Sequence, residues 1–479
     1  MKFPVLARHP DAASFRRHLQ SLAPELDCVD EPAGGAGPLA RPLEVEGLRL
    51  PNRWGIHPME GWDGTPEGLP TEATFRRWRR FGRSGAGLVW GGEAFAVEAS
   101  GRANPRQLFL NDAADTAGSL AALREEILAG RREQGLDPEA TVVGLQLTHS
   151  GRWARPTAAG PAPRTAWTHP VLDRRAGAGP ENVLSDDELR RIRDRFVRAA
   201  VLAQRAGFDF VDVKACHGYL LHELLGARDR PGPYGGSLEG RTRLFREIVE
   251  RIRAECPGLT VATRISAVEV VPYRPDPETG EGVPEPWEQH LPWRAGFGVD
   301  PEDPRRPDPA EACALLGILR GLGIRLVNVS LGSPYTTPHL QRPAAWPPSD
   351  GYLPPEDPLA SVALHLRVVR RLKEAAPETV LVGSGYTYLQ EWLPHVAEYE
   401  AGAGHVDLVG LGRMVLSYPE LPLDHLAGRP LDRRRLCRTF SDCTTAPRNG
   451  LRSGCYPLDP YYRKRPEAGQ VRSLRRRPV

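Results

Sequence analysis

Short apolar runs alternate with longer amphipathic stretches along most of the chain. The stretches between the runs have helical length, which is typical of parallel sheets with crossover helices. Eight strand–helix units in succession predict a (β/α)8 barrel of the α/β class, and the Gly-x-Gly-x-x-Gly fingerprint of an open dinucleotide-binding sheet follows none of the runs. The eight runs expected to be buried strands are Trp54–His57, Leu88–Gly91, Val142–Leu147, Phe210–Val213, Val261–Ile265, Leu326–Ser330, Val380–Gly383 and Leu408–Gly410.

The clearest of the predicted helices begins just after Ser185. The segment Ser185–Glu188 has the serine and glutamate spacing of a capping box, in which each side chain bonds to the backbone N–H of the other residue. Leu189, Ile192 and Phe196 then recur at helical spacing and form one apolar face. Gly207 follows the last apolar position and is predicted to end the helix.

Three regions fall outside the regular repeat. Residues 1–44 form an N-terminal extension with one expected helix and a Gly/Pro-rich join to the barrel. The barrel is predicted to span residues 45–431, and residues 268–308, after its fifth strand, form a proline-dense insert. Such an insert is a lid or binding loop, or else disordered, and its place on the active face favours a lid. Residues 432–479 form a C-terminal tail.

Charge and composition fit one large enzyme. The 479 residues carry 63 Lys and Arg against 60 Asp and Glu, a net charge of +3. The basic residues are interspersed with acidic ones, which gives no case for nucleic acid as a partner. No apolar run approaches ~20 residues and the N-terminus lacks a secretory core, so no membrane partner is expected either. Seven scattered cysteines indicate a reducing compartment, and the cytoplasm is the predicted location.

Polar or glycine residues follow the carboxyl ends of all eight predicted strands, where barrel enzymes keep their active sites. The most informative end is that of Phe210–Val213, which runs directly into Lys214 and then His217 and Tyr219, three proton-active side chains. Because all eight ends meet at one mouth of a barrel, we expect these groups to share a site. The other candidate side chains at these ends are Glu60, Glu93, Gln146 and Arg264.

The last two strand ends predict a phosphate site. Ser384 and Gly385 follow the seventh strand and offer backbone N–H groups with no bulky side chain in the way. Gly412 and Arg413 follow the eighth strand and add a guanidinium that can pair with phosphate through two hydrogen bonds. Loops after strands seven and eight are the recurrent phosphate-binding position of this fold.

These segments together resemble the old yellow enzyme family of NADH:flavin oxidoreductases, flavoenzymes that reduce activated carbon–carbon double bonds. The resemblance covers about Leu39 to Leu421, and the chain is similar to the barrel domain of proteins such as 2,4-dienoyl-CoA reductase and trimethylamine dehydrogenase. Each matching segment alone is weak evidence for the resemblance. Together, in this order and with this spacing, the segments are strong evidence. The pieces are Asn52-Arg53, Pro58-Met59, Gly144–Arg152, His217–Leu221, Tyr234–Glu239, Arg264–Ser266 and Gly412–Met414.

The resemblance implies that FMN is held non-covalently over the barrel mouth, with its phosphate at the last two strands. Gln146 would bond to the pyrimidine edge of the isoalloxazine. Arg264 would lie by the N1/C2 carbonyl, where a fixed cation stabilises the reduced flavin. Main-chain groups of Pro58–Glu60 would face the O4/N5 edge, and Glu93 is a further candidate residue of the cofactor site.

The reaction that the family suggests has two halves. NADH or NADPH reduces FMN, and an electron-poor alkene then takes hydride from flavin N5. Lys214 and His217 match the two positions that hold the substrate carbonyl oxygen, and Tyr219 matches the tyrosine that donates a proton. A phenol with a pKa near ~10 is protonated at neutral pH, which suits that role. Tyr219 could instead be a rim aromatic packed on the flavin, and a structural role for His217 is also open.

Three positions of the expected site depart from the family pattern. Lys214 replaces a histidine, and its ammonium could hold an oxyanion or carboxylate more strongly than imidazole does, or could be structural in an ion pair with Asp212 or Glu60. Glu60 stands where the family has threonine or cysteine, and Thr148 replaces a common aromatic residue, which would widen or wet the pocket. We hypothesise a coupled Lys214–Glu60 pair that selects an anionic or strongly polar substrate.

The tail departs from the longer relatives, which carry a four-cysteine iron–sulfur site just after the barrel. This chain has Cys437, Cys443 and Cys455 there, with Phe440 at the second ligand position. Four thiolates normally hold such a cluster, so we expect no metal. The tail is instead predicted to pack on its own aromatic side chains, which are Phe440, Tyr456, Tyr461 and Tyr462.

The predicted function is an FMN-dependent reductase of activated alkenes or related acceptors, with NADH or NADPH as donor. An alternative is an FMN-dependent dehydrogenase or demethylase of a small amine or acid. A non-catalytic barrel is disfavoured by the joint presence of Gln146, Arg264, Gly385 and Arg413. With no further nucleotide-binding domain expected, electrons would come from diffusible nicotinamide or an electron-carrier partner. The natural substrate, the choice between NADH and NADPH, and homo-oligomer formation are left open.

Overall fold

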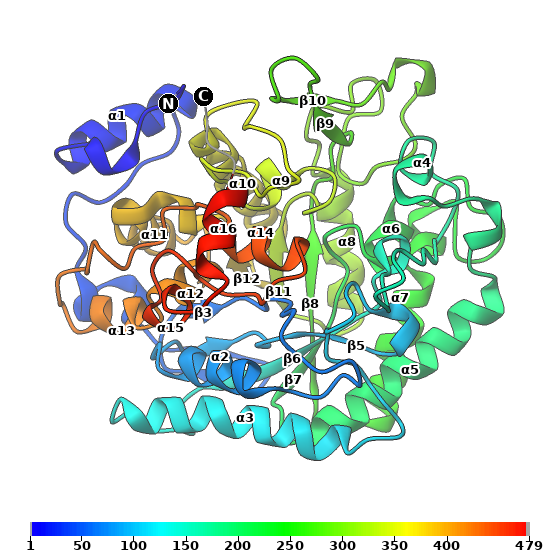
Figure 1. The fold of residues 1–479 in the computed structure, drawn as a ribbon, viewed down its shortest axis with the longest axis horizontal. Helices are drawn as coiled ribbons and strands as arrows, with labels where there is room; N and C mark the ends of the chain where they lie inside the picture. The colour runs from blue at the N-terminus through cyan, green and yellow to red at the C-terminus, as the bar shows by residue number, and fades with distance from the viewer. Residues whose placement is uncertain (1, 476–479) are drawn as a thin grey trace.

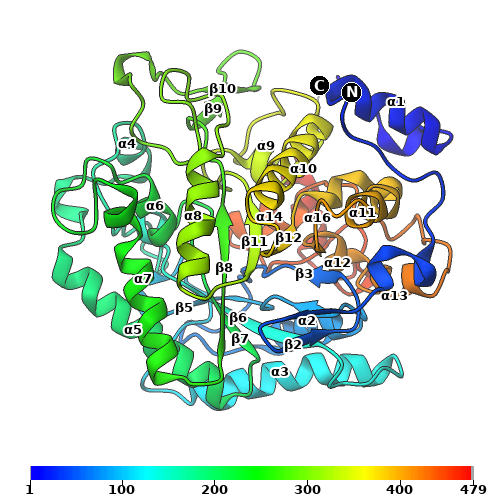
Figure 2. The same ribbon diagram turned by 180° about the vertical axis from the view of Figure 1, so that it is seen from behind.

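In the computed structural model, which describes residues 2–475, eight parallel strands close into a barrel (Figures 1 and 2). Neighbouring strands pair in chain order, and β13 returns to pair with β3 through Val409 and Trp54, which closes the ring. The predicted (β/α)8 barrel is therefore confirmed. Its strands are β3 (Trp54–Ile56), β4 (Leu88–Val89), β6 (Val142–Thr148), β7 (Phe210–Val213), β8 (Thr260–Ser266), β11 (Leu326–Ser330), β12 (Val380–Gly383) and β13 (Leu408–Leu411).

The second strand is broken into two pieces. β4 pairs with the start of β6, and a separate strand β5 (Ala94–Ala96) pairs with the end of β6. Between them Gly91 has a φ of 137°, and a Cβ there would lie 2.8 Å from the backbone nitrogen of Gln146. The observed strand is therefore shorter than the predicted run Leu88–Gly91 and ends at Val89. The reason is that the chain turns at a glycine that packs directly against β6.

Helices form the outer layer of the barrel. The longest is α5 (Asp186–Arg205), which begins with the predicted capping box: Ser185 N–H donates to Glu188 Oε2 at 2.8 Å, and Ser185 Oγ accepts from the N–H of Glu188. Gly207, with a φ of 85°, follows its end as expected. The other helices of this layer are α2 (Glu72–Gly82), α3 (Thr116–Glu133), α7 (Leu238–Glu255), α8 (Ala310–Gly321), α10 (Pro358–Ala375) and α11 (Leu393–Gly402).

The N-terminal segment packs on the outside and under the bottom of the barrel. Helix α1 (Ala12–Leu22) lies near α10, and its Phe15 ring stacks on Trp392 at 5.1 Å. A hairpin of β1 (Leu43–Val45) and β2 (Leu48–Leu50) follows. Its apolar side chains join the cluster inside the amino-terminal end of the barrel, which therefore has a packed bottom.

The insert after the fifth strand and the C-terminal tail add structure at the mouth side. The insert contains a small hairpin of β9 (Tyr273–Pro275) and β10 (Gly282–Pro284). The tail contains α14 (Asp442–Arg448), α15 (Pro460–Arg463) and α16 (Ala468–Leu474) and lies in front of the barrel strands in Figure 1.

The tail has a small core of its own and is fixed to the barrel by ion pairs. Tyr456, Tyr461 and Tyr462 pack in this core as predicted, whereas Phe440 packs against Trp346 of the loop after β11. Asp459 accepts two hydrogen bonds of 2.9 Å from the Arg76 guanidinium of α2. The tail is thus docked on the barrel and does not hang free.

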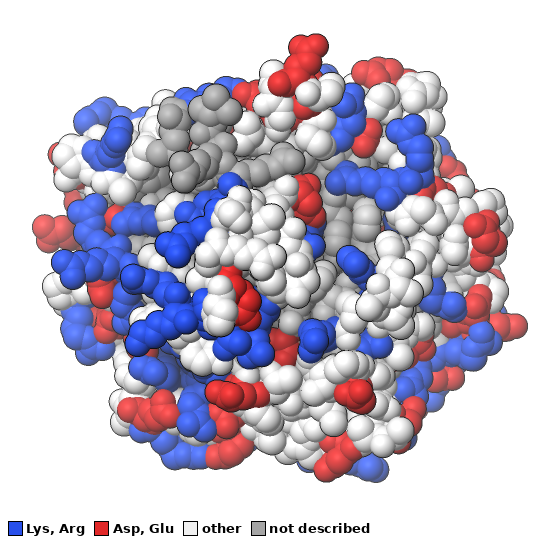
Figure 3. Space-filling model, in the orientation of Figure 1, with Lys and Arg blue, Asp and Glu red and all other residues white. Residues whose placement is uncertain are grey.

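The face drawn in Figure 3 carries charged side chains of both signs, with basic ones gathering on the side of α11 and the tail. Many of these arginines have carboxylate partners, such as Arg433 with Glu391 and Arg429 with Asp424. The charge of this side is therefore partly compensated within the chain. Among residues 2–475, no helix is both long and apolar enough to cross a membrane.

Candidate functional site

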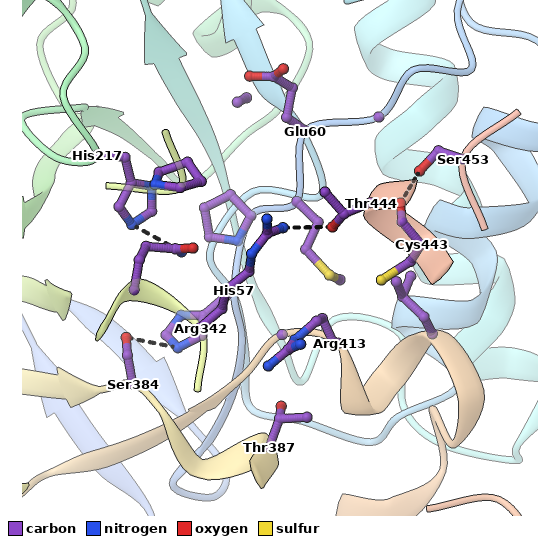
Figure 4. A pocket seen from close by; sticks show the side chains of 18 of the residues that line it. His57, Glu60, His217, Arg342, Ser384, Thr387, Arg413, Cys443, Thr444 and Ser453 are labelled. Atoms are coloured by element: carbon purple, nitrogen blue, oxygen red, sulfur yellow. Dashed lines mark hydrogen bonds between the residues drawn. The ribbon is translucent and has the colours of Figure 1, made fainter. Parts of the chain in front are cut away.

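A cavity of about 260 Å³ opens at the carboxyl ends of the strands (Figure 4). Its wall is formed by residues at the strand ends, by the loop after β11 and by the tail. The predicted residues that line it are Pro58, Met59, Glu60, Gln146, Lys214, His217, Tyr219, Arg264, Ser384, Gly385, Gly412 and Arg413. The structure therefore brings nearly the whole candidate set into one cavity.

Tyr219 lies at the start of α6 (Leu220–Leu225) and its hydroxyl is bonded on two sides. It donates to Glu60 Oε2 at 2.7 Å and contacts Tyr335 Oη at 3.1 Å. Burial, followed by the charge of Glu60, raises the pKa of Tyr219 well above its ordinary value. The phenol is therefore fully protonated near neutral pH, as a proton donor requires.

Lys214 follows β7 and is buried in the cavity wall without a counter-ion. Among residues 2–475, no carboxylate oxygen lies within 4.0 Å of its Nζ. Its Nζ instead lies 3.8 Å from the centre of the Tyr219 ring, a cation–π contact. Burial lowers the pKa of Lys214 from its ordinary value. The expected ion pair with Asp212 or Glu60 is not formed, because Asp212 and Glu60 bond to other donors.

His217 is held in an unusual backbone conformation beside Lys214. Its φ of 66° is left-handed, which is uncommon for a residue with a Cβ and is often found at functional sites. Its Nε2 lies 2.8 Å from Ser330 Oγ, and its backbone N–H donates to Ser266 Oγ at 3.0 Å. Burial and the nearby cations lower the pKa of His217 well below its usual range, so the ring is neutral.

Asp212 orients the amide of Gln146. The buried carboxylate accepts from Gln146 Nε2 at 2.6 Å, from Trp90 Nε1 at 2.6 Å and from the backbone N–H of Arg264 at 2.8 Å. Because the Gln146 amide N–H is taken by Asp212, its carbonyl oxygen is left as an acceptor. Asp212 is thus a support for the cavity wall and not a partner of Lys214.

Arg264 extends from β8 into the cavity with few partners. Its Nη2 donates to Ser384 Oγ at 3.2 Å, and its Nε has no hydrogen-bond partner within residues 2–475. The side chain is only 5% exposed, and among the described residues no carboxylate lies within 4.0 Å of its guanidinium. Burial lowers its pKa. A buried cation without a counter-ion is costly, which points to an anionic ligand at this end of the cavity.

The part of the cavity that is predicted to bind phosphate is open and basic. A Cβ added at Gly412 would meet no atom within 4 Å, so a ligand can approach the backbone closely there. Arg413 donates from Nη2 to Pro343 O at 2.7 Å, but its buried Nη1 has no hydrogen-bond partner in the described part of the chain. Arg342, from the loop after β11, likewise has an unpartnered Nη2, and burial together with the charges of Arg448 and Arg413 lowers its pKa to about 9.

Glu93 lies one layer behind the cavity wall. Its Oε1 accepts from the backbone N–H of Gly61 at 2.6 Å, and its Oε2 accepts from Arg77 Nη2 at 2.5 Å. Arg77 also pairs with Asp63 at 3.0 Å and donates to Met59 O at 3.1 Å. This ion cluster fixes the loop after β3, so Glu93 positions cavity residues without reaching the cavity itself.

Several lining residues were not predicted from the sequence. Tyr335, Gln341 and Arg342 come from the segment that follows β11. The tail adds Cys443, Thr444, Pro447, Arg448 and Ser453. Thr444 Oγ1 accepts from Arg342 Nη1 at 2.5 Å, so the tail positions a cavity arginine. No motif marks these residues, and only the path of the chain over the mouth places them there.

The three tail cysteines lie near one another beside the cavity. Cys437, Cys443 and Cys455 all line a small space next to Arg413. Burial raises the pKa of Cys437 and of Cys455. Within residues 2–475, no group of three or more His, Cys, Asp or Glu side chains is arranged to hold a metal ion.

The donor set of the cavity fits FMN, the group that the resemblance implies. Within residues 2–475, Arg264 Nε and Arg413 Nη1 have no hydrogen-bond partner, and these nitrogens and the open backbone at Gly412 are available to bind the negatively charged groups of a ligand. The flavin presents a phosphate at one end and a pyrimidine that gains negative charge on reduction at the other. Gln146 adds an acceptor beside Arg264, which suits a pyrimidine ring with alternating N–H and carbonyl groups.

The chain is 28% identical over 323 residues to an NADH:flavin oxidoreductase of Gibberella zeae, covering 63% of this chain and 70% of the relative. It is 30% identical over 234 residues to an NADPH dehydrogenase of Bacillus subtilis, covering 48% of this chain and 63% of the relative.

Solved structures share the fold at lower identity. A 2-naphthoyl-CoA reductase in complex with 2-naphthoyl-CoA superposes with a TM-score of 0.65 at 18% identity, over 91% of this chain and 58% of its own. Histamine dehydrogenase from Rhizobium sp. 4-9 gives a TM-score of 0.62 at 20% identity, over 88% of this chain and 52% of its own. The chain thus spans little more than half the length of either neighbour, and at these identities the likeness shows the fold alone.

The model of one protein family matches residues 38–278, about half of the chain. The matched segment contains the first five strands of the barrel and carries Glu60, Gln146, Lys214, Tyr219 and Arg264 of the cavity. This family and its relatives imply FMN as cofactor, with NADH or NADPH as the electron donor. The chain belongs to the NADH:flavin oxidoreductase / NADH oxidase family.

Proposed function

We propose that this protein is an FMN-dependent oxidoreductase that uses NADH or NADPH to reduce an activated, electron-poor alkene or a related acceptor. The observation that carries the proposal is that Lys214, His217 and Tyr219 line one cavity together with Arg264 and Arg413. When bound, FMN would accept a hydride from the nicotinamide and deliver one to the acceptor.

The residues of the fourth strand end have separate roles in this proposal. The Lys214 ammonium and the neutral His217 ring hold the oxygen of the substrate and draw electron density from its double bond. Tyr219 delivers the proton to the other alkene carbon, since its phenol is protonated across the neutral pH range. Gln146 and Arg264 hold the pyrimidine edge of FMN, and Gly385, Gly412 and Arg413 hold its phosphate.

The cavity favours a polar or anionic acceptor over a simple enone. Lys214 has no carboxylate within 4.0 Å among residues 2–475, so its charge is free to pair with the substrate. An uncompensated ammonium in a buried wall is costly unless a ligand supplies the negative charge. The Lys214–Glu60 hypothesis is therefore modified: Lys214 selects for negative charge by itself, and Glu60 bonds to Tyr219.

A dehydrogenase working on a small amine or acid is the second candidate. The observation in its favour is the Glu60 carboxylate behind Tyr219, because a carboxylate acceptor helps a phenol to take a proton from a substrate. The fold neighbour from Rhizobium sp. 4-9 is a histamine dehydrogenase, which agrees with this direction of reaction.

The visible absorption spectrum of the purified protein, recorded before and after anaerobic addition of NADPH, tests the proposed function. We expect an oxidised flavin spectrum that bleaches on addition and returns when an activated alkene is supplied. A flavin that stays oxidised with NADPH and NADH but bleaches with an amine would favour the dehydrogenase. A protein that binds no added FMN would refute both candidates.

Replacing Lys214 with methionine tests the role of the ammonium. We expect the Kd of a carboxylate-bearing acceptor analogue to rise by about tenfold or more, since one charge-assisted contact is lost. The ammonium exists below the pKa of Lys214, which burial lowers, so wild-type affinity should fall as the pH rises and the variant should show no such fall. Titration of the flavin spectrum with the analogue at several pH values measures both effects.

A neutral analogue of the same shape is the control for Lys214→Met. Its affinity should change little, because methionine keeps most of the apolar stem of lysine. Equal weakening of the charged and the neutral analogue would show that Lys214 shapes the pocket and does not select charge.

A further inference from the structure

His217 is enclosed by three serine hydroxyls that come from two neighbouring strands and the loop after one of them. Ser266 ends β8 and is paired across the sheet with Ser330, which ends β11, and Ser333 lies three residues after Ser330. All three serines are 0% exposed. Each of them bonds to a different atom of His217, so together they hold both its backbone and its ring.

Two of the serines hold the backbone of His217 in its left-handed conformation. The His217 N–H donates to Ser266 Oγ at 3.0 Å, and Ser333 Oγ donates to the His217 carbonyl at 3.0 Å. Ser266 Oγ donates in turn to Gly332 O at 2.8 Å. Because both backbone polar groups are bonded to buried side chains, the φ of 66° is held from both sides and the ring has a fixed attachment point.

The third serine bonds to the ring. Ser330 Oγ lies 2.8 Å from His217 Nε2, and Gln341 Nε2 lies 3.5 Å from the same atom, at the outer limit of a hydrogen bond. Within residues 2–475 no group bonds to His217 Nδ1. Since His217 lines the cavity (Figure 4), Nδ1 is the ring nitrogen that is left for a ligand.

The direction of the hydrogen bond between Ser330 and His217 decides which ring nitrogen carries the proton. The neutral ring has one N–H donor and one acceptor nitrogen. If Nε2 were the donor, the buried Ser330 hydrogen would have no acceptor among the described residues. If Nδ1 carries the proton, Ser330 donates to Nε2 and its hydrogen is bonded. Buried hydroxyl groups are nearly always bonded, so the second arrangement is the favoured one.

We propose that Ser330 is a positioning residue that fixes the proton of His217 on Nδ1, so that the ring presents an N–H donor to the activating oxygen of the substrate. This inference rests on the function proposed above and deepens it. Ser330 is not among the described residues that line the cavity, so its hydroxyl acts through the ring and not by touching the substrate.

The fixed tautomer narrows the class of substrate. Lys214 lines the same cavity and has only donor hydrogens, and His217 Nδ1–H adds a second donor. Two donors suit an atom that offers only lone pairs, such as the oxygen of a ketone, a carboxylate or a nitro group. An ammonium group would meet two N–H donors and no acceptor from this pair. Lys214 and His217 therefore favour an oxygen-activated alkene over an amine as the substrate.

The tautomer of His217 can be measured directly in the purified protein, with or without bound FMN. Two-dimensional ¹H–¹⁵N NMR with ¹⁵N-labelled histidine distinguishes protonated from unprotonated ring nitrogens, and His217→Gln identifies the signals of this residue. We expect the wild-type proton on Nδ1 and a mixture of tautomers in Ser330→Ala, because Nε2 loses its donor. A wild-type proton on Nε2, or an unchanged tautomer in Ser330→Ala, would overturn the proposal.

Ligand binding gives a second readout that needs no turnover. Cyclohexanone, a ketone with no double bond to reduce, is titrated into the FMN-loaded protein and followed in the flavin spectrum, and cyclohexylammonium is the donor of similar size. Ser330→Ala should raise the Kd of cyclohexanone about tenfold, the effect of one hydrogen bond at a buried site. Ser330→Thr keeps the hydroxyl and should restore the wild-type Kd. Tighter wild-type binding of cyclohexylammonium than of cyclohexanone would contradict the pair of donors.

Ser84→Ala is the matched control for loss of a buried serine hydroxyl. Ser84 is 1% exposed and donates to Phe81 O at 2.6 Å, between the end of α2 and the start of β4. The His217 tautomer and the Kd of cyclohexanone should be those of the wild type in this variant. A wild type whose flavin is reduced by neither NADPH nor NADH would instead refute the proposed function, while the NMR experiment would still test the contact between Ser330 and His217.

Discussion

Replacing Tyr219 with phenylalanine is expected to slow reoxidation of the reduced enzyme by an alkene acceptor by about 10²–10⁴-fold, the usual effect of losing a general acid. Reduction by NADPH should change by less than about threefold, because hydride transfer from the nicotinamide needs no proton from the phenol. The ring and its cation–π contact with Lys214 are kept in this variant. Stopped-flow absorbance of the flavin measures the two half-reactions separately.

Tyr234→Phe is the matched control for the loss of a phenol. Tyr234 is buried and donates to Glu247 at 3.1 Å, so its removal also breaks a tyrosine–carboxylate hydrogen bond. It lies outside the cavity, and both half-reactions should remain at the wild-type rate. A Tyr219→Phe enzyme that reoxidises as fast as Tyr234→Phe would show that Tyr219 is only a rim aromatic.

Replacing Arg264 with methionine is expected to weaken FMN binding by about 100-fold, or about 2.7 kcal/mol, while the apoprotein becomes more stable. The guanidinium is 5% exposed, its Nε has no partner, and among residues 2–475 no carboxylate lies within 4.0 Å. Removing an uncompensated buried charge should raise the free energy of unfolding of the apoprotein by about 1 kcal/mol. Fluorescence titration with FMN and urea unfolding of the apoprotein measure the two effects.

Arg77→Met is the control for burial of an arginine. Arg77 is paired with Asp63 at 3.0 Å and with Glu93 at 2.5 Å, so its loss leaves two buried carboxylates without a cation. We expect this apoprotein to lose about 3–5 kcal/mol of stability. If Arg264→Met destabilised the apoprotein to a similar extent, Arg264 would be a structural residue and not a ligand-binding cation.

The barrel and most of the site could be predicted from the sequence because both depend on local patterns. Seven of the eight apolar runs match observed strands within one residue at each end, and Phe210–Val213, Leu326–Ser330 and Val380–Gly383 have the same bounds as the strands. The capping box at Ser185 fixed the start of α5 for the same reason. Closure of a barrel then brings every strand end to one mouth, so the polar residues that follow the strands meet there.

The partners of those residues could not be predicted, because they depend on contacts between distant segments. Tyr219 and Glu60 are 159 positions apart, and their hydrogen bond exists only because the first and fourth strand ends face each other across the mouth. From the sequence, Lys214 could either hold a substrate oxygen or pair with Asp212 or Glu60. Asp212 instead bonds to Trp90 and Gln146, which leaves the ammonium uncompensated.

The sequence by itself thus determined the fold and the chemical identity of the strand-end residues, since hydrophobic periodicity and strand order are properties of the chain alone. Only the tertiary structure decided how the cavity is closed. The loop after β11 brings Tyr335 and Arg342 over the mouth, and the tail adds Thr444, which holds the Arg342 guanidinium at 2.5 Å. Neither segment has a periodic pattern that marks a site. They line the cavity because they pack against the barrel, and this packing brings side chains from distant parts of the sequence around one space.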